Sequence, residues 1–278
     1  MTSHHKPLPR LLAICADDFG LSPGVSAAIA QLARTQRISA VSCMTNTPEW
    51  EPSAPMLTDL PSSVAIGLHI NLTDGRPLSP ELAAVWPSLP SLPMLMARSH
   101  LGLLPHEAIQ REIQAQWTAF VTHAGRRPQF VDGHQHVHQF PGVRTAMLDT
   151  LDAMQARPAV RSAACVIGPG HAFKRWVIRR SGARKLASLL HERKLDTNTV
   201  LLGVYDFRAT DYRSLMQTWM SALPAPGGLL FCHPGLGEET SSGDHPGVAR
   251  QREFDYLSGG HFMEDLASAN IALVRAWP

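Results

Sequence analysis

The sequence predicts an α/β fold in which about seven parallel strands form a distorted (β/α) TIM-like barrel. Short apolar runs alternate with amphipathic segments along the chain, and this alternation implies parallel strands joined by helical crossovers. Seven or eight such units favour a closed or nearly closed barrel over an open sheet. Polar residues capable of chemistry follow the ends of the apolar runs, so we expect the active site at the C-terminal rim.

The strands are expected at short apolar runs bounded by turn-forming residues. These runs cover residues 11–16, 39–44, 64–72, 129–133, 159–167, 199–204, 228–232 and 271–276. The first helix is expected to begin at Ser22 and Pro23, a capping residue followed by the proline that favours a first turn. Further helices are expected at about 105–123, with Gly125 at its C-terminal end, and at about 143–154.

Residues 1–278 are expected to form a single domain, since no composition break or internal repeat divides them. Residues 73–104 are rich in proline, leucine and serine and lack periodicity, which predicts a long excursion or lid that carries substrate selectivity. The formal net charge of +2 is too small to indicate a nucleic-acid partner. No apolar run is long enough to span a bilayer, and four cysteines without a CxxC motif fit buried thiols in the cytoplasm. The oligomeric state is left open.

Residues 132–138 read DGHQHVH, with histidines at every second position after an acidic residue. Neutral imidazole is the commonest protein ligand of catalytic transition metals, so the run indicates a metal centre. In an extended strand His134, His136 and His138 would share one face and could serve one site. An incidental histidine cluster is the plainer interpretation, and the apolar stretch 129–131 before the run argues against it.

Two adjacent carboxylates, Asp17 and Asp18, stand where the first apolar run ends. Neighbours in a regular strand point to opposite faces, so both can serve one site only where the strand breaks, and Gly20 favours such a break. Turn or helix-capping acids are the alternative interpretation. His69 and His233 also stand at strand ends, the first after small residues and the second before a Pro-Gly turn.

Together these segments resemble the YdjC/ChbG family of metal-dependent carbohydrate deacetylases. The matching segments are 16–22 (ADDFGLS), 66–69 (IGLH) with 72–73 (LT) and 75–78 (GRPL), 132–138 (DGHQHVH), and 232–235 (CHPG). They occur in order over nearly the whole chain. The resemblance implies a barrel hydrolase that removes an acetyl group from an N-acetylated amino sugar in an oligosaccharide or glycolipid.

By the family pattern, the metal ligands are Asp18, His69 and His134, the general base is Asp17, and the general acid is His233. The other two histidines of the run receive no metal role. Two imidazoles and one carboxylate suit a transition metal, so zinc is the expected cofactor, and magnesium is the alternative because the family accepts several divalent ions. Asp17 would take a proton from metal-activated water, and His233 would protonate the departing amine.

Two other functions fit part of the pattern. One keeps the same metal triad in a barrel amidohydrolase or phosphoesterase, and the other is a carbohydrate- or metal-binding protein without turnover. The additional carboxylate of Asp17 argues against pure binding, which does not need it.

Two further segments have a functional and a plainer interpretation. Between residues 174 and 194, eight lysines and arginines are opposed only by Glu192. A solvated helix face is the favoured interpretation of this basic segment, and contact with an anionic membrane surface is the alternative. Residues 205–208 lie near a strand end and could line a sugar site or form an ordinary loop.

Overall fold

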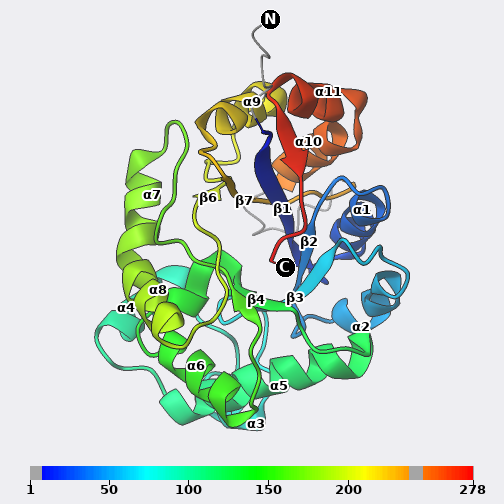
Figure 1. The fold of residues 1–278 in the computed structure, drawn as a ribbon. Helices are drawn as coiled ribbons and strands as arrows, with labels where there is room; N and C mark the ends of the chain where they lie inside the picture. The colour runs from blue at the N-terminus through cyan, green and yellow to red at the C-terminus, as the bar shows by residue number, and fades with distance from the viewer. Residues whose placement is uncertain (1–7, 238–246, 278) are drawn as a thin grey trace, which may run out of the picture.

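The computed structural model describes residues 8–237 and 247–277, and in them every strand pair of a single curled sheet is parallel (Figure 1). The strand order is β5-β4-β3-β2-β1-β7-β6, and β8 pairs with β1 beside this path. The strands are β1 (Arg10–Phe19), β2 (Ala40–Cys43), β3 (Ala65–Ile70), β4 (Phe130–Gly133), β5 (Ala159–Val160), β6 (Leu201–Leu202), β7 (Gly227–Cys232) and β8 (Ile271–Leu273). The predicted α/β barrel with about seven parallel strands is confirmed.

The barrel closes irregularly between its edge strands β5 and β6. The segment after β5 bridges the gap, since Val166 pairs with Leu201 in an isolated parallel bridge. Both edge strands are shorter than predicted, because side-chain contacts replace part of the regular ladder. The Ser162 N–H donates to Oδ1 of Asn198 at 2.8 Å, and Nδ2 of Asn198 donates to the Ser162 carbonyl at 2.9 Å.

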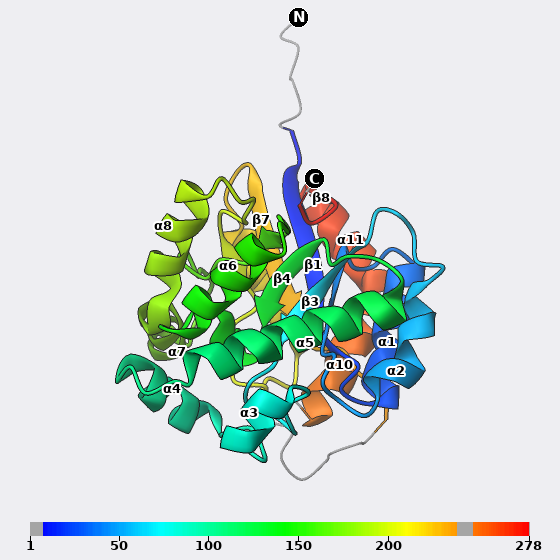
Figure 2. The same cartoon turned by 90° about the horizontal axis from the view of Figure 1, so that it is seen from below.

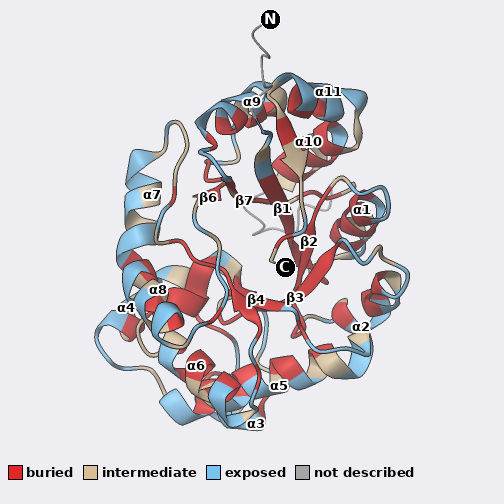
Figure 3. Cartoon of the chain, in the orientation of Figure 1, coloured by how far each residue is buried: buried red, intermediate tan, exposed pale blue. Residues whose placement is uncertain are grey.

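Helices surround the sheet and turn their exposed faces to solvent (Figures 1 and 3). The helical elements are α1 (Pro23–Arg34), α2 (Trp50–Ser53), η1 (Ala54–Leu57), α3 (Pro80–Val85), α4 (Leu92–His100), α5 (His106–Ala124), η2 (His134–Gln139), α6 (Val143–Ala153), α7 (Ala172–Ile178), η3 (Arg179–Ala183), α8 (Arg184–Glu192), α9 (Tyr212–Ala222), α10 (Gly247–Ser258) and α11 (Gly260–Ser268). The predicted cap is confirmed, because the Ser22 side chain accepts from the Val25 N–H at the start of α1. Gly125 ends α5 in the left-handed conformation, with φ 65°. None of these helices has the length and apolar character needed to cross a membrane.

The excursion 73–104 contains two short helices, α3 and α4, that the sequence did not predict. Each is shorter than three turns and carries proline in its first turn, so neither shows a recognisable period. Leu82 and Leu95 are buried in the core, and the buried carboxylate of Glu112 on α5 accepts the Ser79 N–H at 2.8 Å. Figure 2 shows α3 and α4 below the long helix α5. A lid role for this excursion stays a prediction.

Aromatic rings fill the barrel interior. The ring of Phe130 stacks on Trp277 with centroids 4.3 Å apart. Gly67 on β3 makes room for it, since a Cβ there would lie 2.5 Å from atoms of the Phe130 ring. Alanines such as Ala13 and Ala65 belong to the same interior cluster. The barrel interior is thus apolar, and the polar residues of the candidate site lie at the carboxyl ends of the strands.

Candidate metal centre

Asp17 and Asp18 serve the same region because β1 is irregular near its end. The register of β1 against β2 shifts between Ala16 and Phe19. Within this irregularity Asp18 has a φ of 72°, a left-handed conformation that breaks the alternation of side chains. The sequence pattern predicts that the strand ends at residue 16 and that a loop follows. Instead β1 continues to Phe19, and the bulge brings both carboxylates to the site.

The three predicted metal ligands lie together. Oδ1 of Asp18 is 3.0 Å from Nδ1 of His134 and 3.4 Å from Nε2 of His69. The candidate ligand atoms of all three residues lie within 4.8 Å of one another. Asp18 and His69 are buried, and His134 is 15% exposed. One divalent cation could contact two imidazole nitrogens and one carboxylate at this spacing.

Asp132 fixes the orientation of the His69 ring. The two residues are register partners on β4 and β3, and Nδ1 of His69 lies 2.6 Å from Oδ1 of Asp132. Ser42 on β2 donates to the same carboxylate oxygen at 2.5 Å. A ring N–H directed at Asp132 leaves the Nε2 lone pair facing Asp18, which is how carboxylates orient metal-binding histidines. The contact of Nδ1 with Asp132 is therefore the one expected of a histidine that binds a metal through Nε2.

The charges around the cluster favour a cation. Burial lowers the pKa of His69, but the carboxylates of Asp132, Asp18 and Asp17 together raise it to about 10, so a cation bound at Nε2 would replace a proton there. Burial raises the pKa of Asp18, yet Arg250 and His134 hold it well below its usual range. Nη2 of Arg250 donates to Oδ2 of Asp18 at 2.8 Å, so the other carboxylate oxygen faces the histidines.

Arg161 is the central charge of the site. Its Nη1 and Nη2 donate to the two carboxylate oxygens of Asp17, each at 2.6 Å, and Nη2 also lies 2.6 Å from Oδ2 of Asp132. Burial opposes its charge, but Asp132 and Asp17 raise the pKa of Arg161 well above its usual value. The sequence motifs do not point to this residue. Its one signal was an isolated charge in an otherwise apolar and small-residue run.

A second group with metal-ligand spacing consists of Cys15, Asp17 and Asp132. The guanidinium of Arg161 already pairs with both carboxylates of this group. Burial raises the pKa of the Cys15 thiol well above its usual value, which disfavours the thiolate that binds metal. The group is therefore a buried ion-pair network.

The histidine run does not continue strand β4. The strand ends at Gly133, and the run folds into η2, where His136 has a left-handed φ of 61°. His134 reaches the cluster, whereas Nε2 of His138 hydrogen-bonds to the carbonyl of Arg161 at 3.0 Å. The expectation that the three histidines share one strand face is wrong. The chain turns back tightly here, since a Cβ on Gly133 would lie 2.9 Å from the backbone nitrogen of His138.

His233 follows β7 and is enclosed by aromatic rings. Its ring meets those of Phe207 and Phe231 edge-on, with centroids 5.2 and 5.5 Å apart. Burial lowers the pKa of His233 to about 4, against the opposing effect of the carboxylates of Asp18 and Asp17. The imidazole is therefore neutral at pH 7. The buried Nδ1 of this ring has no hydrogen-bond partner among the described residues.

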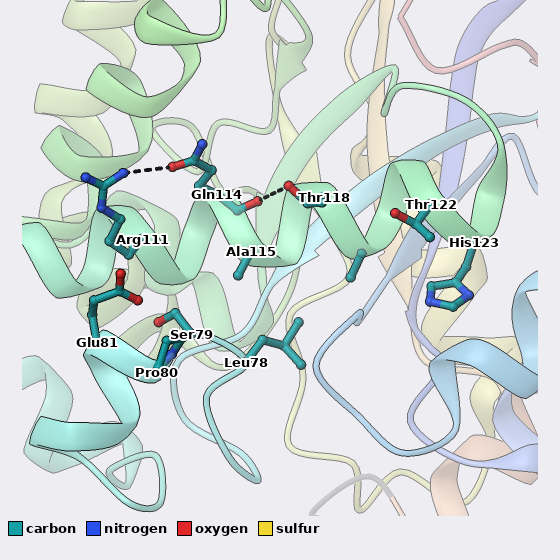
Figure 4. A pocket seen from close by; sticks show the side chains of 11 residues that line it. Leu78, Ser79, Pro80, Glu81, Arg111, Gln114, Ala115, Thr118, Thr122 and His123 are labelled. Carbon is teal, nitrogen blue, oxygen red and sulfur yellow. Dashed lines mark hydrogen bonds between the residues drawn. The ribbon is translucent and has the colours of Figure 1, made fainter.

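A groove of about 460 Å³ lies elsewhere, between the start of α3 and one face of α5 (Figure 4). Its lining includes Glu81, Arg111 and His123. None of the predicted site residues lines it. The groove is separate from the candidate metal centre.

Fold and site together define an α/β barrel protein with a candidate metal centre at the carboxyl ends of its strands. The family model for YdjC-like protein matches residues 11–268, and the chain belongs to this family.

Curated relatives named chitooligosaccharide deacetylase match part of the chain. The protein from Enterobacter sp. (strain 638) is 34% identical over 136 residues, and the one from Citrobacter koseri is 31% identical over 146 residues. Each match covers 49% of this chain and 53% of the relative, so the chain spans about half the length of the curated relatives it matches. Among solved structures, a proposed cellobiose-phosphate cleavage protein from Enterococcus faecalis V583 aligns with a TM-score of 0.73 at 19% identity. That alignment covers 96% of this chain and 97% of the other, and it shows a shared fold.

Proposed function

We propose that the protein is a metal-dependent N-deacetylase that releases acetate from an N-acetylated amino sugar in an oligosaccharide or glycolipid. The observation that carries this proposal is the convergence of Asp18, His69 and His134 beside the further carboxylate of Asp17. The name of the curated relatives, chitooligosaccharide deacetylase, supports the substrate class.

Asp18, His69 and His134 would hold the cation. Two imidazoles and one carboxylate suit zinc best, and magnesium is the alternative. A divalent cation at this position supplies a Lewis acid that polarises a carbonyl oxygen and lowers the pKa of water.

Asp17 is the proposed general base. Arg161 holds both of its oxygens through paired hydrogen bonds, so the carboxylate is fixed in orientation and remains able to accept a proton through its other lone pairs. His233 is the proposed general acid, since an amine leaves readily only after protonation. Burial lowers the pKa of His233 to about 4, so the resting ring is neutral and must take up a proton during the reaction before it can protonate the amine. The water proton accepted by Asp17 is the source that balances this step.

The test compares two substrates and one variant. The zinc-loaded protein is incubated with N,N′-diacetylchitobiose and with bis(p-nitrophenyl) phosphate, and acetate and p-nitrophenol are measured. We expect acetate from the sugar, and we expect D17N to lower its rate by about 10²–10⁴-fold while retaining zinc. Release of p-nitrophenol without acetate would instead support a phosphoesterase, and zinc binding without either product would support a binding protein.

In α8, the basic segment 174–194 fits a solvated helix face. The apolar Leu186 and Leu190 of α8 are buried. Arg184 and Lys185, the first two residues of this helix, are exposed. Sedimentation with anionic liposomes tests the alternative of membrane contact, which requires salt-sensitive binding. A cytoplasmic location stays a prediction, supported by the four cysteines being free thiols.

A further inference from the structure

One buried carboxylate joins two loops at the rim of the barrel. Glu253 lies on α10 and is fully buried. Its Oε2 accepts the backbone N–H of His233 at 2.6 Å, in the loop after β7. Its Oε1 accepts the hydroxyl of Tyr205, which lies in the loop after β6. A buried carboxylate is costly unless it is hydrogen-bonded, and here both oxygens are.

Arg250, one helical turn before Glu253, holds the other side of His233. Its Nη1 lies 3.4 Å from the His233 carbonyl oxygen, and its Nη2 donates to the proposed ligand Asp18 at 2.8 Å. The Gly235 N–H donates to the Arg250 carbonyl at 3.0 Å. Helix α10 therefore contacts both backbone polar groups of His233 and also contacts the metal cluster.

Glu253 also acts on the His233 ring through Tyr205. The ring of Tyr205 meets Phe207 edge-on at 4.6 Å, and Phe207 meets the His233 ring edge-on at 5.2 Å. The hydroxyl of Tyr205 anchors this row of rings to the carboxylate. Glu253 thus contacts the backbone of His233 directly and supports its imidazole indirectly, through Tyr205 and Phe207.

We propose that Glu253 is the positioning residue of the general acid His233, and that Arg250 sets the position of His233 relative to the metal ligand Asp18. This inference rests on the proposed deacetylase function. It explains why two charged side chains of α10 point into the protein, where apolar residues would otherwise pack. A displacement of about 1 Å in a catalytic group can cost on the order of 10²-fold in rate.

The test separates proton donation from the other steps. An amide substrate needs a proton on the leaving amine, whereas p-nitrophenyl acetate releases a stable phenolate without one. For E253Q we expect kcat on N,N′-diacetylchitobiose to fall about 10²-fold, with KM and hydrolysis of the ester changed less than about 3-fold. Zinc affinity, measured by competition with a chromogenic chelator, should stay within about 3-fold of the wild type. Y205F removes only the hydroxyl donor and should show the same selective loss at about 10-fold.

E112Q is the matched control. Glu112 is also a buried carboxylate that accepts backbone N–H groups, from residues 78 and 79, and it contacts neither His233 nor the metal cluster. We expect E112Q to lower the thermal midpoint but to leave the ratio of amide to ester hydrolysis unchanged.

Equal losses on both substrates in E253Q and Y205F would overturn the positioning role, and so would unchanged amide hydrolysis in both. If E253Q does not fold, Y205F alone decides between these results. A wild-type protein that binds zinc but releases no acetate from the sugar would refute the proposed function itself, which is a different outcome from an active wild type with unaffected variants.

Discussion

Arg161 and Asp17 are joined by two hydrogen bonds of 2.6 Å each, and both side chains are buried. The same guanidinium lies 2.6 Å from Asp132, whose other oxygen holds the ring of His69. One buried cation therefore balances the proposed general base and the carboxylate that orients a proposed metal ligand. A substitution of Arg161 therefore affects both Asp17 and the Asp132–His69 pair.

Substitution of Arg161 should lower both stability and activity. R161M leaves two buried carboxylates without their partner, so we expect the free energy of unfolding to fall by about 3–5 kcal/mol. R161K keeps the charge, but an ammonium cannot make the paired contact with Asp17 and reach Asp132 together, so we expect a smaller loss of stability and a fall in acetate release of about 10²-fold or more. Urea denaturation and steady-state kinetics measure these effects. R126K, at an exposed arginine, serves as the control. An R161M protein as stable as the wild type would contradict the role of the ion pair.

Zinc binding should depend on the three proposed ligands. In D18N, H69A and H134A we expect zinc retained after dialysis to fall well below one ion per chain. Zinc should raise the free energy of unfolding of the wild type by about 2.7 kcal/mol when free zinc is about 100 times Kd, and it should not do so in these variants. Elemental analysis and thermal unfolding measure the two effects. H123A removes an exposed histidine on α5 and should behave as the wild type. Full zinc occupancy in both H69A and H134A would refute the ligand assignment.

Stability should decrease in mild acid because of His138. Burial lowers the pKa of its ring from 6.5 to about 4, while Nε2 contacts the Arg161 carbonyl. Between these pH values the unfolded chain binds a proton that the native protein excludes, so the free energy of unfolding falls as pH falls, by up to about 3 kcal/mol. Above pH 6.5 both states are neutral, and this residue gives no pH dependence.

H138Q separates this effect from other titrations. Glutamine keeps an N–H donor for the Arg161 carbonyl but does not titrate, so the loss of stability between pH 6.5 and pH 4 should be smaller than in the wild type. Urea denaturation at several pH values gives the slope. H123Q, at an exposed position, should keep the wild-type slope. An unchanged slope in H138Q would show that other groups carry the acid sensitivity.

The sequence predicted the barrel and the strand-end residues because both depend on local pattern. Apolar runs fix the strands, and residues such as His69 and His233 stand immediately at their ends. The path of the chain just beyond a strand depends on tertiary contacts, which periodicity does not record. The bulge at Asp18 and the tight turn after Gly133 are of this kind.

The missed site residues act across long separations in sequence. Arg161 contacts Asp17, 144 positions away, and Arg250 contacts Asp18, 232 positions away. From the sequence alone, a charged residue on a helix such as α10 is expected to face solvent, because its distant partner is not known. An isolated arginine in an apolar run, such as Arg161, indicates a buried ion pair. The sequence does not indicate which carboxylate is its partner.

Gly67 should resist substitution because Phe130 fills the space above it. A Cβ at Gly67 would lie 2.5 Å from ring atoms of Phe130, and this ring cannot easily retreat because it stacks on Trp277 at 4.3 Å. Overpacking of this kind typically costs about 1–3 kcal/mol, so we expect G67A to lower the thermal midpoint by several degrees. G260A is the control, since a Cβ at Gly260 meets nothing within 4 Å. The double variant G67A/F130L should recover part of the loss, because the two residues share the same space. Additive losses in the double variant would show that the clash with Phe130 is not the cause.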